Sequence, residues 1–276
     1  MTSIGDVPLE RLRCVVVVPT YNEAENVAAL AEGVCRALPG ADLWLVDDGS
    51  PDGTADVAEG LFASRVEYAG YRVIRRSGPR GLGRAYREGF LRALRAGYDR
   101  VFQMDADLSH DPGALPELWR ASLTADVCIG SRYCAGGVVR NWPWHRHMLS
   151  RFAVWYVRCV AGIPVADSTA GFRCWTRRAL EAVQLETLCS EGYSFQVEMT
   201  HRALRAGMRV VEVPIVFTDR RHGRSKISRR VLVESMWMPW RLRWRPWCPA
   251  VAAVRSRGGS ASGSPSLVIS GREDEG

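Results

Sequence analysis

Asp105 and Asp107 are the residues of this sequence whose type and spacing point most directly to chemistry. They follow an apolar run that predicts a buried strand, and residues i and i+2 of an extended chain point to the same side. Both carboxylates can then reach one ion, and hard oxygen ligands select Mg²⁺ or Mn²⁺. Such an ion would bridge to a diphosphate and neutralise charge on a leaving group. Loops that cap a following helix also contain this pair of aspartates. The metal-site interpretation therefore depends on the acidic residues of the neighbouring loops as well.

Acidic residues also lie in the loops after two other predicted strands. Glu23 follows the first strand, and Asp47, Asp48 and Asp52 follow the second. Ligands of open α/β sheets bind beyond the carboxyl ends of the strands, so these loops are where function is expected. Aspartate is also an ordinary turn residue. We expect Asp47 or Asp48 to accept hydrogen bonds from a nucleotide, and Asp52 to cap the helix near Thr54.

The glycine-rich loop from Gly78 to Arg84 resembles a phosphate-binding loop, but its residues do not match the known motifs. Arg84 and Ala85 stand where a P-loop needs Lys followed by Ser or Thr. Tyr86 occupies the third glycine position of the dinucleotide fingerprint. The loop is therefore expected to be a turn that opens a helix and lies against a donor molecule.

The elements that position these loops alternate along the chain. Strand-like apolar runs end at Val18, Val46, Arg75, Met104 and Ile129. The intervening periodicity predicts helices over Glu23–Leu38, Thr54–Ala63, Gly83–Ala96 and Pro112–Leu123. Strands about 30 residues apart with a helix between each pair are typical of repeated βαβ units. The sequence predicts an α/β, Rossmann-like fold with a mostly parallel central sheet and helices on both faces.

Six motifs together resemble one family of enzymes. They are Val-Pro-Thr-Tyr-Asn-Glu, Val-Asp-Asp-Gly-Ser-Pro-Asp-Gly-Thr, Met-Asp-Ala-Asp-Leu-Ser-His-Asp-Pro, Gly130–Tyr133, Ser190–Tyr193 and Arg220–Ser228. In order and spacing, from about Val15 to about Ile227, they look like polyprenol- and dolichol-phosphate mannosyltransferases of the inverting glycosyltransferase family 2. The resemblance implies a glycosyltransferase A-type fold. It also implies transfer of mannose from GDP-mannose to a polyprenol phosphate with inversion, for lipid-linked glycan or glycoprotein synthesis.

The resemblance also implies roles for individual residues. The positions that match the donor nucleotide-sugar site are Pro19, Tyr21, Glu23, Asp48 and Asp105, and those that match the metal site are Asp105 and Asp107. Some relatives carry Gln as a metal ligand where this chain has the shorter Ser109.

The positions that match the acceptor-phosphate site are Arg132, Arg146 and Ser150. Arg146 and Ser150 are four residues apart on a predicted helix, so both can face one anion. A solvated arginine face is the alternative.

Arg220 and Lys226 match positions expected to hold phosphates near the bond being broken. Lys226 is the one lysine among 37 basic residues, and a lysine ammonium is a compact point charge that arginine does not replace. Together with Asp107, they are expected to act on the departing diphosphate. Asp167 is expected to be a base or an acceptor-positioning group, with a structural turn as the alternative. A phosphate acceptor is mostly a dianion at neutral pH and needs little help from a base.

Length, composition and charge limit the number of domains and the classes of partner. The 276 residues are 47% hydrophobic, which fits one catalytic domain, residues 14–247, between an N-terminal extension, 1–13, and a Gly/Ser-rich tail, 248–276. The formal charge of +7 favours an anionic partner. No run approaches the roughly 18 apolar residues of a spanning helix. The eight cysteines lack zinc spacing and are expected to be reduced.

The chain is therefore expected in the cytoplasm, bound peripherally to the cytoplasmic face of a membrane. Four tryptophans interleaved with arginines predict an interfacial anchor, with core packing as the rival: Trp237, Trp240, Trp244 and Trp247. Pro239 and Pro246 argue against one uninterrupted helix there. A separate membrane-protein partner stays open.

Three other functions remain to be weighed. A polyprenol-phosphate glucosyltransferase that uses UDP-glucose shares the same motifs. An RNA-binding protein would use the basic C-terminal segment but would not need Asp105 and Asp107, so no nucleic-acid partner is expected. A dinucleotide oxidoreductase is disfavoured by the failed fingerprint.

Overall fold

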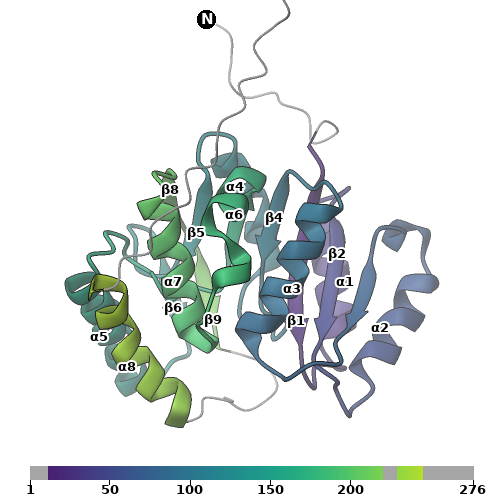
Figure 1. The fold of residues 1–276 in the computed structure, drawn as a ribbon. Coiled ribbons are helices and arrows are strands. Elements are labelled where there is room, and N and C mark those ends of the chain that lie inside the picture. The colour runs from purple at the N-terminus through teal and green to yellow at the C-terminus, as the bar shows by residue number, and fades with distance from the viewer. Residues whose placement is uncertain (1–11, 220–228, 245–276) are drawn as a thin grey trace, which may run out of the picture.

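The computed structural model describes residues 12–219 and 229–244 (Figure 1). Seven strands form one sheet in the order β3-β2-β1-β4-β7-β5-β8. Their bounds are β1 Cys14–Thr20, β2 Asp42–Asp47, β3 Arg72–Arg75, β4 Arg100–Gln103, β5 Val127–Ser131, β7 Arg173–Thr176 and β8 Val210–Pro214. A separate two-stranded sheet pairs β6 (Val138–Arg140) with β9 (Val216–Thr218). The predicted α/β architecture with a mostly parallel sheet is confirmed.

Strand β7 is the exception to the parallel order, and the sequence did not predict it. It runs antiparallel to both of its neighbours, β4 and β5. Its four residues are all buried, and one of them is Arg173, which breaks the apolar run that marks the other strands. A short central strand with a buried charge carries too little periodicity to be recognised.

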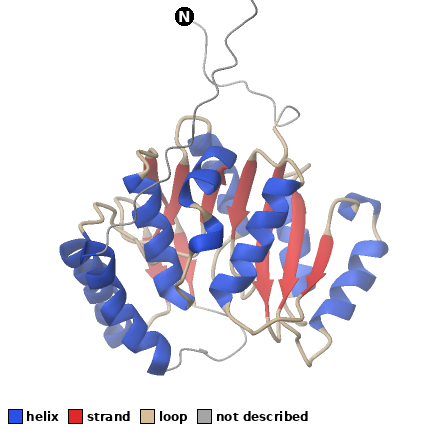
Figure 2. Ribbon diagram, viewed as in Figure 1, coloured by secondary structure: helices blue, strands red, loops and turns tan. Residues whose placement is uncertain are grey.

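Helices cover both faces of the sheet (Figure 2). Their bounds are α1 Val27–Ala37, α2 Thr54–Ala63, α3 Leu82–Arg95, α4 Leu115–Ser122, α5 Trp144–Ala161, α6 Arg177–Val183, α7 Gly192–Arg205 and α8 Arg229–Trp244, with three 3₁₀ turns at Val66–Tyr68, Pro112–Ala114 and Leu185–Thr187. Because strand side chains alternate, Val16 and Val18 pack towards α1, α2 and α4, whereas Val15 and Val17 pack towards α3, α6 and α7. The sheet therefore separates two apolar clusters.

Two predicted helices begin later than their periodicity suggested. The first starts at Val27, because residues 21–26 form a turn in which Asn22 has a φ of 56°. The fourth begins as a 3₁₀ turn at Pro112 and becomes α-helical only at Leu115. The two displaced starts leave irregular backbone beyond β1 and β4, where the acidic motifs lie.

The C-terminal helix α8 corrects one expectation. It continues from Arg229 to Trp244 with Pro239 inside it, so the proline does not divide it. Met238 and Leu242 are each 5% exposed and belong to the apolar cluster around α3 and α7. Their burial offsets the cost of the helix hydrogen bond that proline cannot donate. Pro246 and Trp247 lie outside the described residues.

Two further features of the described residues concern helix length and the cysteines. The described residues include no helix long and apolar enough to cross a bilayer. The seven cysteines within them are all unbridged.

Gly89 and Gly60 offer a test of how closely α3 packs on the sheet. A Cβ at Gly89 would lie 2.5 Å from Cγ1 of Val17 and 3.2 Å from Cγ2 of Val46, both fully buried. Alanine improves helix propensity by about 1 kcal/mol, but overpacking costs about 1–3 kcal/mol. We expect Gly89→Ala to lower the free energy of unfolding in urea titrations.

The matched control is Gly60→Ala in α2, where the added Cβ meets nothing within 4 Å. This variant should gain about 0.5–1 kcal/mol from propensity alone. Equal stabilisation of both variants would show that α3 does not approach the sheet as closely as these contacts require.

Candidate active site

The three aspartates at the end of β2 and in the loop after it have different roles. Asp47 is 3% exposed and accepts hydrogen bonds from Thr20 Oγ1 at 2.9 Å and from the backbone of Ser50 at 2.9 Å, so it holds the turn. Asp52 Oδ1 accepts from the backbone of Thr54, the first residue of α2, at 3.0 Å, whereas the N-cap residue itself is Gly53. Asp48, the remaining aspartate, faces the loop after β3.

Asp48 joins the loops after β2 and β3. Its Oδ2 accepts a hydrogen bond from the backbone of Gly81 at 3.0 Å, and its Oδ1 pairs with Arg76. Arg76 also donates to Glu88 in α3 at 2.9 Å and is almost fully buried. This connection was not predicted, because nothing in the spacing of Asp48 and Arg76 shows that their strands are neighbours in the sheet.

The other predicted donor residues line the end of β1. Pro19 is in β1, opposite Val46, and Tyr21 follows it. The guanidinium of Arg80 lies 4.4 Å from the ring centre of Tyr21 and donates to its hydroxyl. Glu23 accepts from Asn26 at 2.8 Å. The three loops after β1, β2 and β3 are therefore linked by side-chain contacts at one sheet edge.

Asp105 lies just beyond β4, against α3. Its Oδ1 is 2.9 Å from the hydroxyl of Tyr86, and its backbone N–H points to Nδ1 of His110 at 3.4 Å. Burial raises the pKa of Tyr86 well above its ordinary value, so the hydroxyl stays protonated and can donate. Burial lowers the pKa of His110, which favours the neutral ring beside the carboxylate.

Asp107 lies in a turn and not on an extended continuation of the strand. Strand β4 ends at Gln103, residues 106 and 107 form a turn, and Leu108 has a φ of 56°. Asp107 Oδ1 accepts a hydrogen bond from the backbone of Ser109 at 3.0 Å. The backbone is therefore not extended through Asp107 as predicted, although both aspartates remain at this edge.

The residues around Asp105 and Asp107 suit a hard divalent cation. Within the described part of the chain, no group of three or more His, Cys, Asp or Glu side chains is placed to hold a metal. Mg²⁺ is commonly bound by one or two carboxylates, with water and substrate phosphates as the other ligands. Two carboxylates fit that pattern and do not fit a closed structural metal centre.

Arg132 and Asp167 form a buried ion pair beside this edge. Arg132 Nε and Nη2 donate to the two oxygens of Asp167 at 2.7 and 2.8 Å, and the Arg132 backbone donates at 3.0 Å. The Asp167 side chain is fully buried, and that of Arg132 is 9% exposed. An aspartate that accepts three such bonds is placed to orient Arg132.

The predicted acceptor residues lie together around two aromatic rings. The guanidinium carbons of Arg146 and Arg132 lie 4.2 and 5.7 Å from the ring centre of Trp142. The hydroxyl of Tyr133 donates to Ser150 Oγ at 2.7 Å, and the Arg132 guanidinium lies 5.2 Å from the Tyr133 ring. Two cations and a hydroxyl from β5 and α5 thus share one polar cluster.

Asp219 completes this cluster from the end of β9. Both of its oxygens accept from Arg146 Nη1, at 2.9 and 3.0 Å. The sequence reasoning missed Asp219, which lies 73 positions from Arg146, and it also missed Trp142 as a neighbour of both arginines. The other two predicted phosphate-binding residues, Arg220 and Lys226, lie outside the described residues.

Arg173 supports the Asp167 loop from inside the protein. It is fully buried, and it donates to the carbonyls of Ser168 and Ala170 at 2.9 and 2.8 Å. Burial lowers its pKa to about 10, so it remains charged at neutral pH. On the other side of the loop, Glu212 accepts from the backbone of Asp167 at 2.9 Å. The loop is held from both sides, and the sequence reasoning identified neither support.

Known proteins with similar sequences indicate the family to which this chain belongs. Residues 15–183 match the model of glycosyl transferase family 2. The chain is 44% identical over 236 residues to a polyprenol monophosphomannose synthase of Mycolicibacterium smegmatis, covering 84% of this chain and 88% of that protein. It is 43% identical to an undecaprenyl-phosphate mannosyltransferase of Micrococcus luteus, covering 82% of this chain and 91% of that protein.

A solved structure shares the fold at lower identity. Glucosyl-3-phosphoglycerate synthase from Mycobacterium tuberculosis, in complex with Mn²⁺, uridine diphosphate and glucosyl-3-phosphoglycerate, superposes with a TM-score of 0.57 and 20% identity. The match covers 83% of this chain and 77% of that one. Motifs, fold and relatives agree, and the chain belongs to glycosyltransferase family 2.

Proposed function

We propose that this glycosyltransferase transfers mannose from GDP-mannose to a polyprenol phosphate with inversion. The observation that carries the proposal is the cluster of Arg132, Arg146 and Ser150, in a chain more than 40% identical to two relatives named for polyprenol-phosphate mannose synthesis. Two guanidinium groups and a hydroxyl suit a phosphate monoester, because arginine pairs with phosphate oxygens through two parallel hydrogen bonds.

The donor is proposed to bind across the loops after β1, β2 and β4. Asp48 offers carboxylate oxygens to a nucleotide base or ribose, with Pro19, Tyr21 and Glu23 beside it. Asp105 and Asp107 would hold Mg²⁺ or Mn²⁺ with the diphosphate. Bound there, the ion would neutralise charge on the leaving diphosphate. The Mn²⁺ in the solved relative supports a divalent cation for this fold.

The reaction we propose is a direct displacement at the anomeric carbon. The acceptor phosphate is mostly a dianion near neutral pH and attacks without a dedicated base. Asp167 is then a positioning residue, since both of its oxygens are bonded to Arg132. Arg220 and Lys226 are proposed to stabilise the departing diphosphate through charge.

The test is a donor competition in one assay. Labelled GDP-mannose and labelled UDP-glucose are each offered with a short polyprenol phosphate and Mg²⁺ or Mn²⁺, and the lipid product is counted. We expect mannolipid, with little glucolipid. Glucolipid alone would make the chain a polyprenol-phosphate glucosyltransferase, and no lipid product from folded protein would contradict the proposal.

A membrane face on α5 and α8 is the second part of the proposal. The two helices lie side by side (Figure 1), and the Tyr156 hydroxyl of α5 donates to the Met236 carbonyl of α8 at 2.7 Å. Eight large apolar side chains on them are more than half exposed: Trp144, Met148, Leu149, Phe152, Trp155, Met236, Trp237 and Trp244. Exposed arginines lie on the same helices, which suits an anionic bilayer: Arg151, Arg158, Arg241 and Arg243.

Point substitutions test this face better than a truncation. Removing the chain after Ser235 would also delete Met238 and Leu242, which are core residues. We expect Leu149→Ser/Phe152→Ser/Trp237→Ser to lower partition onto phosphatidylglycerol vesicles by at least about tenfold, from lost apolar burial. Val66→Ser, at a 90% exposed position on another element, is the control. Unchanged sedimentation of the triple variant would remove the membrane face from the proposal.

A further inference from the structure

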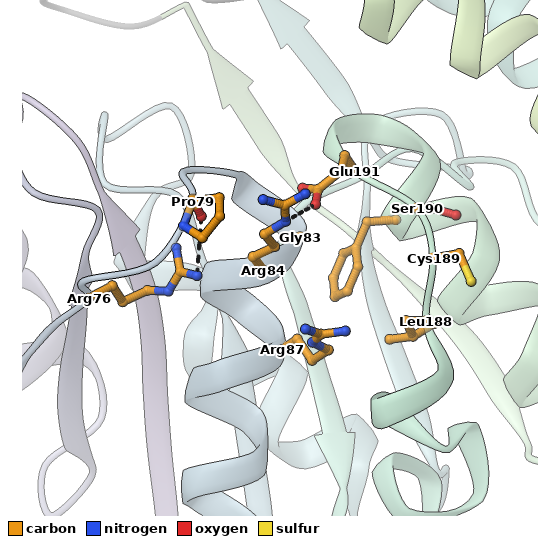
Figure 3. A pocket seen from close by; sticks show the side chains of 10 residues that line it. Arg76, Pro79, Gly83, Arg84, Arg87, Leu188, Cys189, Ser190 and Glu191 are labelled. Carbon is orange, nitrogen blue, oxygen red and sulfur yellow. Dashed lines mark hydrogen bonds and ion pairs between the residues drawn. The ribbon is translucent and has the colours of Figure 1, made fainter.

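A cavity of about 500 Å³ lies between the N-terminal turns of α3 and α7 (Figure 3). We call it the α3/α7 pocket. Three arginines line it: Arg76 from the loop after β3, and Arg84 and Arg87 from α3. Across from them lie residues 188–191 and Phe195. This volume is within the range of about 300–1,000 Å³ that small-molecule sites occupy.

An aromatic wall separates the α3/α7 pocket from Asp105. Phe195 lines the pocket, and its ring is stacked on that of Tyr86 with centroids 6.0 Å apart. Both residues are buried, with exposures of 1% and 0%. The hydroxyl of Tyr86 lies against Asp105 on the other side. The rings of Phe195 and Tyr86 therefore lie between the pocket and the carboxylate of Asp105.

The charges around the pocket favour an anion. Arg76 pairs with Asp48 and Glu88, and Arg84 forms an ion pair with Glu191 at 2.6 Å. Arg87 has no hydrogen-bond or ion-pair partner among the residues that the structure describes. It lies three residues after Arg84, so both guanidinium groups are on one side of α3. The N-termini of α3 and α7 add the positive ends of two helix dipoles.

We propose that the α3/α7 pocket is a second ligand site, which binds a small phosphorylated molecule through Arg87 and Arg84. A phosphate group presents three oxygens and can accept from two guanidinium groups at once. Pro79, Leu188 and Phe195 provide apolar surface for the remainder of the ligand. This site adjoins the proposed donor site through Arg76, which pairs with Asp48, and it does not depend on which sugar is transferred.

Cys189 provides a readout that does not involve sugar transfer. Its thiol is exposed and lines the pocket, whereas Cys159 is an exposed thiol on α5 and is absent from the lining. The experiment measures alkylation of each cysteine by iodoacetamide, with mass spectrometry, in the full-length protein with EDTA. Inorganic pyrophosphate is the probe. We expect it to slow alkylation of Cys189 and to leave Cys159 unchanged.

Three variants test which residues are needed for the protection of Cys189 by pyrophosphate. Arg87→Gln should raise the half-protecting pyrophosphate concentration by about tenfold or more, because a charge-assisted hydrogen bond is lost. Arg95→Gln changes an exposed arginine of the same helix outside the pocket and should have no effect. Asp107→Ala should also leave protection unchanged.

Three results would overturn the site. The first is no protection of Cys189 at millimolar pyrophosphate, and the second is equal protection in Arg87→Gln. The third is loss of protection in Asp107→Ala, which would assign the anion to the metal site. Because no transfer is measured, these results are independent of the outcome of the donor competition.

Discussion

Asp107→Ala is expected to abolish metal-dependent sugar transfer, with a loss of at least about 10³-fold in kcat/KM. The proposed ion would be left with Asp105 as its one protein carboxylate, and charge on the leaving diphosphate would lose its main stabilisation. The measurement is mannolipid formation at saturating Mg²⁺ or Mn²⁺. Excess metal should recover little of the loss, since the missing ligand also orients the ion.

The matched control is Asp56→Ala. Asp56 is a carboxylate on α2 whose side chain is 76% exposed and pairs with Arg75 at the surface. It should retain nearly full activity. If Asp107→Ala kept more than about a tenth of the wild-type rate while remaining folded, this loop would not hold a catalytic metal.

Arg132→Met is expected to cost about 3–5 kcal/mol of unfolding free energy as well as most of the transfer activity. The substitution leaves Asp167 fully buried without its counter-ion, and an uncompensated buried charge is strongly destabilising. Urea denaturation of the purified variant measures the loss. Arg120→Met, which breaks an ion pair whose two side chains are 65% and 61% exposed, should change stability by less than about 0.5 kcal/mol.

A double variant distinguishes lost charge balance from lost packing. Adding Asp167→Asn to Arg132→Met removes the unpaired charge and keeps an oxygen that can accept from the backbone of residue 132. We expect stability to recover by about 1–3 kcal/mol, with transfer still impaired. Additive losses from the two changes would mean that the ion pair does not couple Arg132 to Asp167.

Much of the fold could be predicted from the sequence because its signals are local. The apolar runs before Thr20, Asp47 and Asp105 mark strands, and the periodicity between them marks helices. The turn chemistry of Asp52 was also predictable, since its partner Thr54 is two residues away. Beyond about residue 130 the local signals miss two features. Strand β7 is short and contains a buried arginine, and α8 runs through Pro239 because its packing outweighs a missing hydrogen bond.

In the candidate site, the residue types were likewise predictable from the sequence, but the contacts between them were not. The sequence by itself determined the family, through motifs that each span a few residues, and it identified Asp105, Asp107, Arg132 and Arg146 by type. Only the tertiary structure decided how they are held. It pairs Arg132 with Asp167 across 35 positions and Arg146 with Asp219 across 73, and it leaves eight large apolar side chains of α5 and α8 more than half exposed. Such contacts depend on which strands and helices become neighbours, and neighbours in space leave no mark in the spacing of residues along the chain.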